Sequence, residues 1–402
     1  MGGVPELRFP EFSGEWKEVR LGEISTKPKY GINAPSVPYS VNLPRYLRIT
    51  DIDDEGKYNA GNKVSVDDDS SADYILKDGD IVFARTGATV GKSYLYDSDD
   101  GSLVYAGYLI KFSIDTSQAI PRIISLCAQT NKYWKWVKAT SMRSGQPGIN
   151  GKEYALLKLN LPSLPEQQKI ADFLTAIDEK IAILTDKITQ LETYKKGMMQ
   201  KLLSGELRFP GFTDVWREVK LREIAEKKTI KNTANIISLV LTNSATQGIV
   251  SQRDYFDKDI ANADNLAGYY IVDKGDFVYN PRISVHAPVG PIKRNHLSKG
   301  VMSPLYTVFR LQDGNLTFYE HYFNTTHWYR YMKSIANYGA RYDRMNIKDS
   351  DFFKMPLPFP SLPEQQKIAD FLTAIDDKLT IEQEKLDQLK HYKQGLLQKM
   401  FV

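Results

Sequence analysis

The sequence predicts an α+β protein in which two globular domains are joined by two long helices. The 17 letters PSLPEQQKIADFLTAID occupy residues 162–178 and occur again at residues 360–376. The segment ELRFPEFSGEWKEVRLGEI at residues 6–24 returns as ELRFPGFTDVWREVKLREI at residues 206–224. Runs rich in β-branched and aromatic residues fill the blocks between these repeats. The chain is therefore an internal repeat, with a leading segment, a variable block and a helix in each half.

These repeats divide the 402 residues into four parts. Residues 1–160 hold the leading segment and the first variable domain, and residues 161–205 hold the first helix. Residues 206–358 hold the second leading segment and variable domain, and residues 359–402 hold the second helix. The length suits two or three domains with hydrophobic cores.

Both copies of the repeated run begin as helices. Ser163 and Ser361 each precede a glutamate by three positions, which predicts a capping box with Glu166 and Glu364. Apolar residues then follow at an average spacing of 3.5, the pattern of a coiled-coil seam, with Glu382 interrupting the second copy. The seam residues are Ile170, Leu174, Ile177, Ile181, Leu184, Ile188 and Leu191, and Ile368, Leu372, Ile375, Leu379, Leu386 and Leu389.

Each helix alone would expose its apolar stripe, so we expect the two helices to pack on each other. The alternative is that each helix covers its own domain. Gly197 and Gly395 lie at matching positions, and each costs about 1 kcal/mol relative to alanine. A close backbone approach or a kink would explain the repeated glycine.

The variable blocks share a frame, YILKDGDIVFA at residues 74–84 and YIVDKGDFVYN at residues 270–280. We expect strands at residues 79–84, 102–114 and 275–280. Helical stretches are expected to be fewer than strands, at residues 121–138 and 318–336.

Composition excludes several classes of protein. The single cysteine, Cys127, cannot form an internal disulfide, which favours a reducing compartment. The N-terminal residues do not resemble a signal peptide. No apolar run reaches the ~18 residues of a membrane helix. We therefore expect a cytoplasmic protein with no membrane association.

Motifs for catalysis are incomplete. GATVGKS at residues 87–93 has three residues between its glycines, where a phosphate-binding loop needs four. DIDDEGK at residues 51–57 lacks the preceding Pro-Asp partner of a metal-dependent nuclease. The histidines show no metal-ligand spacing, and no motif for S-adenosylmethionine binding or base methylation is present. We expect no catalytic residue, no metal site and no cofactor bound by this chain.

Basic residues concentrate late in each block. Residues 101–150 hold 6 Lys or Arg against 1 acid, and residues 281–348 hold 10 against 3, although the whole chain carries only +4. Aromatic and amide side chains lie between these basic residues, and this mixture suits contacts with DNA phosphates and base edges. A solvated basic face that binds nothing is the alternative.

LPSLPEQQKIADFLTAIDEKI followed by YKKGMMQKLLSGELRFPGF, in a chain of two variable blocks and two near-identical helices, closely resembles the specificity subunit of type I restriction-modification enzymes. The resemblance covers essentially the whole chain. It implies that the variable blocks are target recognition domains, each reading one half of a two-part site in double-stranded DNA. It also implies that the helices form an antiparallel coiled coil related by a pseudo-two-fold axis. That coiled coil would set the spacer between the half-sites.

The same resemblance implies partners. Two adenine methyltransferase subunits would dock on the helices, and restriction subunits with translocase activity would join them. S-adenosylmethionine, ATP and magnesium would then belong to these partners. Two other hypotheses remain open: a tandem adaptor that binds proteins, and a self-sufficient DNA-modifying enzyme.

Candidate DNA contacts follow from charge and polarity, because Arg, Asn and Gln make bidentate contacts with base edges and Lys supplies phosphate charge. In the first block they are Arg85, Lys92, Arg143, Ser144, Gln146 and Asn150. In the second block they are Asn280, Arg282, Lys293, Arg294, Arg341, Arg344 and Asn346.

Overall fold

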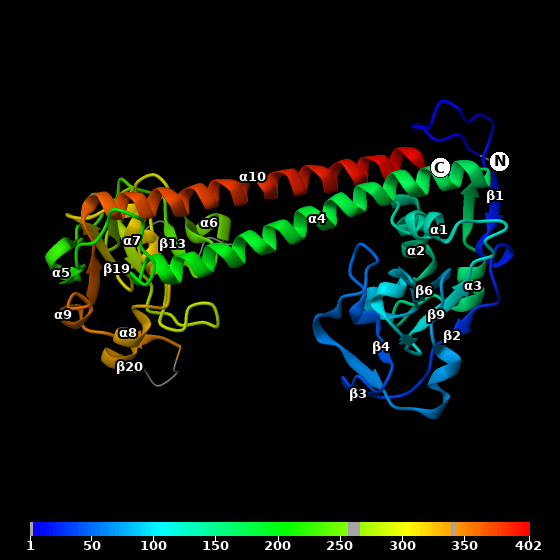
Figure 1. Cartoon of the computed structure of the whole chain (residues 1–402), viewed down its shortest axis with the longest axis horizontal. Coiled ribbons are helices and arrows are strands. Elements are labelled where there is room, and N and C mark those ends of the chain that lie inside the picture. Colours follow the sequence, from blue (N-terminus) through cyan, green and yellow to red (C-terminus); the bar gives the residue numbers. More distant parts are fainter. Residues whose placement is uncertain (1–2, 256–265, 339–342) are drawn as a thin grey trace. The chain divides into compact units, whose positions relative to one another are not determined.

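The computed structural model describes residues 3–255, 266–338 and 343–402. The chain divides into two compact units. Unit 1 comprises Met1–Thr185 with Glu384–Val402, and unit 2 comprises Asp186–Gln383. The helices α4 (Leu164–Leu202) and α10 (Leu362–Met400) each contribute residues to both units (Figure 1). Both lie within the ranges that the repeat predicts.

Unit 1 contains two four-stranded sheets and a strand pair. The first sheet has the order β2 (Lys29–Tyr30), β9 (Leu109–Ser113), β6 (Asp80–Ala84), β7 (Ser93–Leu95). The second has the order β3 (Ser36–Pro38), β5 (Val64–Val66), β4 (Arg45–Leu47), β8 (Leu103–Tyr105). β1 (Lys17–Arg20) pairs with β10 (Lys158–Leu161), and the helices are α1 (Pro121–Cys127), α2 (Asn131–Thr140) and α3 (Gly151–Ala155).

Unit 2 repeats the first sheet as β12 (Ala225–Lys227), β19 (Thr307–Leu311), β16 (Phe277–Tyr279), β17 (Ile292–Arg294). Its strand pairs are β11 (Arg217–Lys220) with β22 (Pro356–Phe359), β13 (Leu241–Ser244) with β14 (Gly248–Ser251), β15 (Tyr270–Val272) with β18 (Gly300–Met302), and β20 (Asn337–Tyr338) with β21 (Met345–Asn346). Its shorter helices are α5 (Leu221–Ile224), α6 (Gln252–Tyr255), α7 (Leu316–Phe323), α8 (Tyr329–Ile335) and α9 (Asp349–Phe352).

The strands predicted at residues 79–84 and 275–280 are confirmed, whereas residues 102–114 divide into β8 and β9, which belong to different sheets. The two predicted helical stretches each split in two as well. The first becomes α1 and α2 because Thr130 caps a new helix by accepting a hydrogen bond from the Tyr133 backbone N–H. The second becomes α7 and α8, with a turn through Asn324 between them. No helix in the described part of the chain is long and apolar enough to cross a bilayer.

The buried carboxylate of the shared frame anchors the central strand of each repeated sheet. Asp80 is 2 % exposed and accepts from the Lys77 backbone N–H at 2.9 Å and from Lys111 Nζ at 3.0 Å. Asp276 is fully buried and accepts from the Asp273 backbone N–H at 2.8 Å and from Arg310 Nε at 2.6 Å. A buried charge requires such partners, which explains why this aspartate is kept in both halves.

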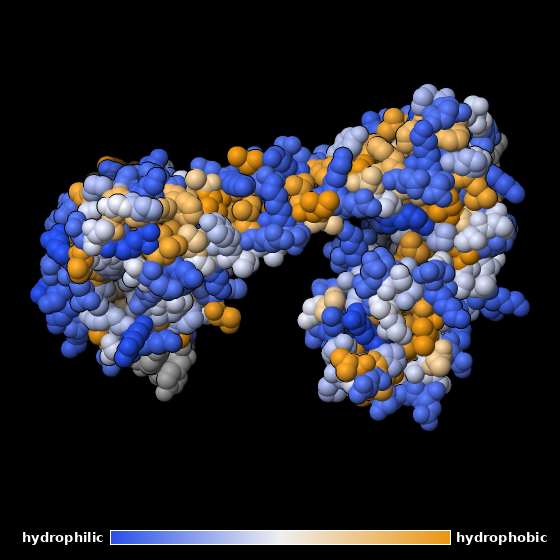
Figure 2. Space-filling model, viewed as in Figure 1, coloured by the Kyte–Doolittle hydropathy of each residue, from blue (hydrophilic) through white to orange (hydrophobic). Residues whose placement is uncertain are grey.

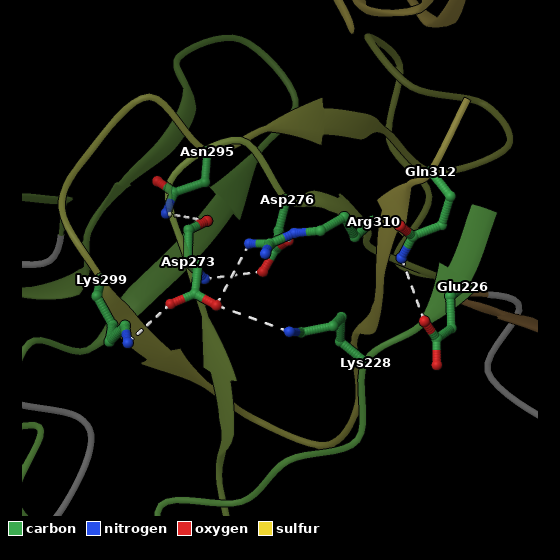
Figure 3. A network of polar contacts seen from close by, with 8 residues as sticks. All are labelled: Glu226, Lys228, Asp273, Asp276, Asn295, Lys299, Arg310 and Gln312. Atoms are coloured by element: carbon green, nitrogen blue, oxygen red, sulfur yellow. Dashed lines mark hydrogen bonds and ion pairs between the residues drawn. The ribbon is translucent and has the colours of Figure 1, made fainter. Parts of the chain in front are cut away.

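In unit 2 this anchor extends into a network of charged side chains (Figure 3). Burial raises the pKa of Asp276, in spite of the hydrogen bonds it accepts from Asp273 and Arg310. Burial also acts to raise the pKa of Asp273, but Lys299, Arg310 and Lys228 outweigh it and hold that pKa below its usual value. The network fixes the turn that precedes β16.

The first turn of each long helix is joined to its leading segment through a buried glutamate. Glu166 accepts from Arg8 Nε and Nη2, both at 2.7 Å, and from Trp16 Nε1 at 3.3 Å. Glu364 accepts from Arg208 at 2.8 Å twice and from Trp216 Nε1 at 2.9 Å. The expected capping boxes are therefore wrong: both oxygens of each carboxylate bind the leading segment instead of the helix start.

The following glutamine joins the helix to the variable domain. Gln167 Oε1 accepts from the Ile120 backbone N–H at 2.9 Å, directly before α1. Gln365 Oε1 accepts from the Asn315 backbone N–H at 2.8 Å, directly before α7. Each Nε2 also donates to the carbonyl of the proline that directly follows the preceding strand. The Glu-Gln pair thus fixes the domain to the helix in both units.

The helices also contact each other within each unit. In unit 1, Lys393 of α10 pairs with Asp178 of α4 at 2.7 Å. In unit 2, Lys195 of α4 pairs with Asp376 of α10. An offset of 198 residues relates Asp178 to Asp376 and Lys195 to Lys393, so the internal repeat converts one ion pair into the other. Both arrangements considered from the sequence therefore occur, since the same helices also contact the variable domains.

The seam residues are buried or half-buried along both helices. Glu382, which interrupts the seam, is only 5 % exposed and pairs with Lys187 at 2.9 Å. The expectation of a close backbone approach at Gly197 and Gly395 is wrong. A Cβ added at either glycine would meet no described atom within 4 Å.

We predict that Arg208→Met lowers the thermal midpoint of the chain by about 5 °C, because the buried Glu364 carboxylate loses its charged partner. The double variant Arg208→Met/Glu364→Leu should recover part of that loss, because no unpaired charge remains. Differential scanning calorimetry measures both midpoints. A double variant that is less stable than Arg208→Met would contradict a buried, mutually dependent pair.

Candidate nucleic-acid interface

In each unit, the loop after the central strand pairs with a second loop much later in the chain. In unit 1, Thr86 forms a β-bridge with Gly148, and the Ile149 backbone N–H donates to the Arg85 carbonyl at 2.9 Å. In unit 2, Arg282 forms a β-bridge with Arg344, and the Met345 backbone N–H donates to the Pro281 carbonyl at 2.9 Å. We call residues 85–92 together with residues 141–150 the unit 1 loop pair. Residues 280–286 together with residues 343–346 are the unit 2 loop pair.

An offset of 196 residues relates the two loop pairs. It carries Thr86 to Arg282 and Gly148 to Arg344, so the same backbone geometry holds different side chains. The chain thus presents two equivalent platforms with unlike chemistry. Asn150 and Asn346 are the exception, since the offset relates two asparagines.

The unit 1 loop pair brings three candidate residues together. The Arg85 guanidinium lies over the Tyr30 ring, 5.1 Å from its centroid. Gln146 lies beside Gly87 and is exposed. Asn150 Oδ1 accepts from the backbone N–H groups of Lys152 and Glu153 and so caps α3. Arg85 and Gln146 are the side chains best placed to meet a ligand, and Asn150 positions its loop.

Two other unit 1 candidates, Lys92 and Arg143, form ion pairs inside unit 1. Lys92 Nζ pairs with Asp54 at 2.7 Å and donates to the Ile52 carbonyl at 3.2 Å. Arg143 pairs with Glu153 at 2.5 Å, and Ser144 is exposed on the same loop. The acidic DIDDEGK turn is therefore an ion-pair partner for Lys92. Asp51 of that turn is bound by Arg48.

In unit 2 the loop pair borders a cleft of about 680 Å³ with many hydroxyl and amide groups among its lining. Asn280 and Arg282 line it, together with Asn243, Ser244, Thr246, Gln252, Ser284, His286, Ser303 and Tyr306. Hydroxyl and amide groups that both donate and accept hydrogen bonds suit base edges. Sequence reasoning missed the LTNSATQG turn at residues 241–248, although its density of such groups was a usable signal.

The unit 2 candidates also differ in burial and in their partners. Asn280 is 8 % exposed, and its Nδ2 donates to the Asn243 carbonyl at 2.9 Å while its Oδ1 accepts from the Arg282 backbone N–H at 3.0 Å. This amide holds the cleft wall. Arg282 and Asn346 are exposed, and Arg344 is 3.9 Å from Asp343. Arg341 lies outside the described residues.

Lys293 and Arg294 face α7 rather than the cleft. Lys293 Nζ donates to Asn324 Oδ1 at 2.6 Å, and burial lowers its pKa. Arg294 pairs with Glu320 at 3.3 Å. Their charge is used inside unit 2, so the net +7 of the sequence count overstates what a ligand would meet.

The single cysteine, Cys127, is buried. Burial raises the pKa of the Cys127 thiol to about 12, which keeps it protonated at neutral pH. Within the described residues, no group of three or more His, Cys, Asp or Glu side chains is placed to hold a metal ion.

We predict that Asn150→Ala lowers the free energy of unfolding by about 1 kcal/mol, because α3 loses its N-cap. Gln146→Ala, on the same loop but exposed, should leave stability unchanged within about 0.5 kcal/mol. Urea denaturation of both variants tests this. Equal losses would show that Asn150 does not support the loop pair.

The family described as type I restriction modification DNA specificity domain matches this chain twice, over residues 13–193 and 213–391. A putative type I restriction enzyme MjaX specificity subunit of Methanocaldococcus jannaschii is 24 % identical and covers 99 % of this chain and 93 % of that protein. The MjaVIII specificity subunit of the same organism is 22 % identical, over 97 % of this chain and 92 % of that protein.

Solved structures share the fold. The type I restriction-modification S subunit from M. genitalium aligns with a TM-score of 0.58 at 14 % identity, over 100 % of this chain and 99 % of that chain. A chain from a study of the complex assembly and conformational transition of the type I restriction-modification system aligns with a TM-score of 0.52 at 17 % identity, over 95 % and 96 % of the two chains.

Proposed function

Because the chain belongs to the type I restriction modification DNA specificity family, we propose that it is the sequence-recognition subunit of a type I restriction-modification complex. Each variable domain reads one half of a bipartite site in double-stranded DNA. The observation that carries this proposal is the pair of equivalent loop platforms with unlike side chains. A shared backbone gives both domains the same approach to a groove, and different side chains give them different bases.

The proposed arrangement of the helices is an antiparallel coiled coil with pseudo-two-fold symmetry. The pairs Asp178–Lys393 and Lys195–Asp376 support it, because the repeat exchanges them. The length of this coiled coil, rather than contacts with bases, sets the gap between the two half-sites.

Partners complete the proposed complex. Two copies of one adenine methyltransferase subunit dock on the repeated helices, and restriction subunits with translocase activity join them. S-adenosylmethionine, ATP and magnesium bind to those partners. Specificity subunits of this family are generally non-catalytic, and this chain supplies recognition and spacing.

Arg282→Ala is expected to weaken binding of the assembled complex to its site by about 10- to 100-fold, the value of a good base contact. The loss should depend on the bases of one half-site and disappear when that half-site is scrambled. Fluorescence anisotropy with duplexes altered in either half measures it. Lys299→Ala is the matched control, because Lys299 is 59 % exposed and pairs with Asp273 away from the cleft.

Salt titration in the same assay separates this proposal from a protein-binding adaptor. Affinity should fall steeply as salt rises, with a slope set by the number of phosphate contacts. A complex that binds no DNA at low salt would sink the proposal. So would an Arg282→Ala variant that loses affinity equally for both half-sites.

A further inference from the structure

The helix before the second loop of each loop pair is an equivalent part of both domains. An offset of 195 residues relates α2 of unit 1 to α8 of unit 2. Thr130 lies directly before α2, and its Oγ1 donates to the Cys127 carbonyl at 2.8 Å. Thr325 of unit 2 donates in the same way to the Tyr322 carbonyl at 2.7 Å. The buried residues that follow also correspond, Tyr133 and Val137 in unit 1 with Trp328 and Met332 in unit 2.

Two basic positions are kept on the outer face of each helix. They are Lys135 and Lys138 in α2, and Arg330 and Lys333 in α8, and all four are exposed. Both members of each pair lie opposite the buried positions, because 3.6 residues make one turn. Within the part of the chain that the structure describes, no carboxylate pairs with any of the four. We call these two surfaces the basic faces.

The surroundings in the sequence leave the basic faces uncompensated. Residues 121–150 and 321–342 hold no Asp or Glu. Like charges three or four residues apart on a helix repel each other. Keeping two of them in both domains therefore costs helix stability and favours an anionic partner.

Each of these helices is held at both ends. In unit 1 the Asn131 backbone N–H donates to Gln398 Oε1 of α10 at 2.9 Å. In unit 2 His327 Nε2 donates to the Gln200 carbonyl of α4 at 3.0 Å. At its other end α2 leads into residues 141–150, and α8 leads into β20, which pairs with β21 of the unit 2 loop pair. Each helix thus joins a long helix to a loop pair within its own unit.

In unit 1 the buried face of α2 also packs on the first loop. Tyr133 Oη donates to the Gly91 carbonyl at 2.6 Å. A Cβ added at Gly91 would lie 2.6 Å from Val137 Cγ1, so helix and loop are in close contact. The basic face of α2 therefore lies within one helix diameter, about 10 Å, of that loop.

The loop pairs and the basic faces differ in what the repeat has kept. The loop pairs hold unlike side chains on one backbone, whereas the basic faces keep the same charge. Contacts that read different bases must differ between the halves, but contacts with phosphates need not. On the face drawn in Figure 2, hydrophilic residues predominate over each variable domain. This suits DNA, because interfaces with DNA are more polar and more positively charged than those between proteins.

We propose that the basic faces of α2 and α8 hold the phosphate backbone of double-stranded DNA beside each half-site, without reading its sequence. This inference rests on the proposed function and identifies the charges that position both domains on the duplex. A role in helix stability alone does not explain both positions. Lys138 and Lys333 lie in the last turn, where a positive charge favours the helix dipole, but Lys135 and Arg330 precede that turn.

The variants Lys135→Gln/Lys138→Gln and Arg330→Gln/Lys333→Gln test this proposal in the assembled complex. Fluorescence anisotropy measures the DNA association constant across a salt titration. Each double variant should reduce the slope of its logarithm against the logarithm of salt concentration by about 1.8, because two phosphate contacts are lost. The same slope predicts about 30-fold weaker binding at about 0.15 M salt. Duplexes with either half-site scrambled should lose the same factor, so the specificity ratio should stay at its wild-type value.

The matched control is Lys77→Gln/Lys274→Gln, which also removes two exposed positive charges. These lysines precede β6 and β16, at the opposite ends of those strands from the loop pairs. The control should keep the wild-type slope and affinity. An unchanged slope in the helix variants, a loss confined to one DNA sequence, or an equal loss in the control would overturn this inference alone. A wild-type complex that binds no DNA would overturn the proposed function as well.

Discussion

The architecture depends on a carboxylate buried at the start of each long helix. Glu166 and Glu364 are each 1 % exposed, and each accepts hydrogen bonds from an arginine and a tryptophan of the preceding leading segment. A buried charge is tolerated only when its lone pairs are filled, so the helix start, the leading segment and the domain are fixed together. The next residue, a glutamine, then binds the backbone at the start of the first helix of the variable domain. The direction of the helix relative to its domain is thereby set by two consecutive side chains.

These contacts of the Glu-Gln pair, which join the helix to its leading segment and domain, change the explanation for the repeated run of 17 residues. The resemblance assigned the identity to partner docking, but the Glu-Gln pair serves contacts inside the chain. Asp178 and Asp376, at the other end of the run, pair with lysines of the opposite helix within their units. The identity of the run is therefore explained first by contacts inside the chain.

Much of the fold could be predicted from the sequence because it rests on local periodicity. The 3.5-residue spacing predicted both helices, and the alternation around Gly79–Asp80 and Gly275–Asp276 predicted the central strands. The capping boxes failed because a serine and a glutamate three residues apart give no information on a competing arginine about 157 residues away. The split of residues 121–138 into α1 and α2 depended on a threonine cap within an otherwise helical pattern, which propensity alone does not resolve.

The candidate interface was harder to predict from the sequence. A count of charges does not distinguish a basic side chain that can meet a ligand from one that is paired with a carboxylate. Lys92, Arg143 and Arg294 belong to the basic stretches, yet each pairs with a carboxylate of its own unit. Arg85 and Arg282 differ because the loop pairs hold their backbones in β-bridged or hydrogen-bonded positions after the central strands. The Asp80 and Asp276 anchors fix the beginnings of those strands, and the loops follow their ends. Rigid scaffolds with variable strand-end loops let recognition diverge while the contacts of the Glu-Gln pair, the sheet and the helices stay the same.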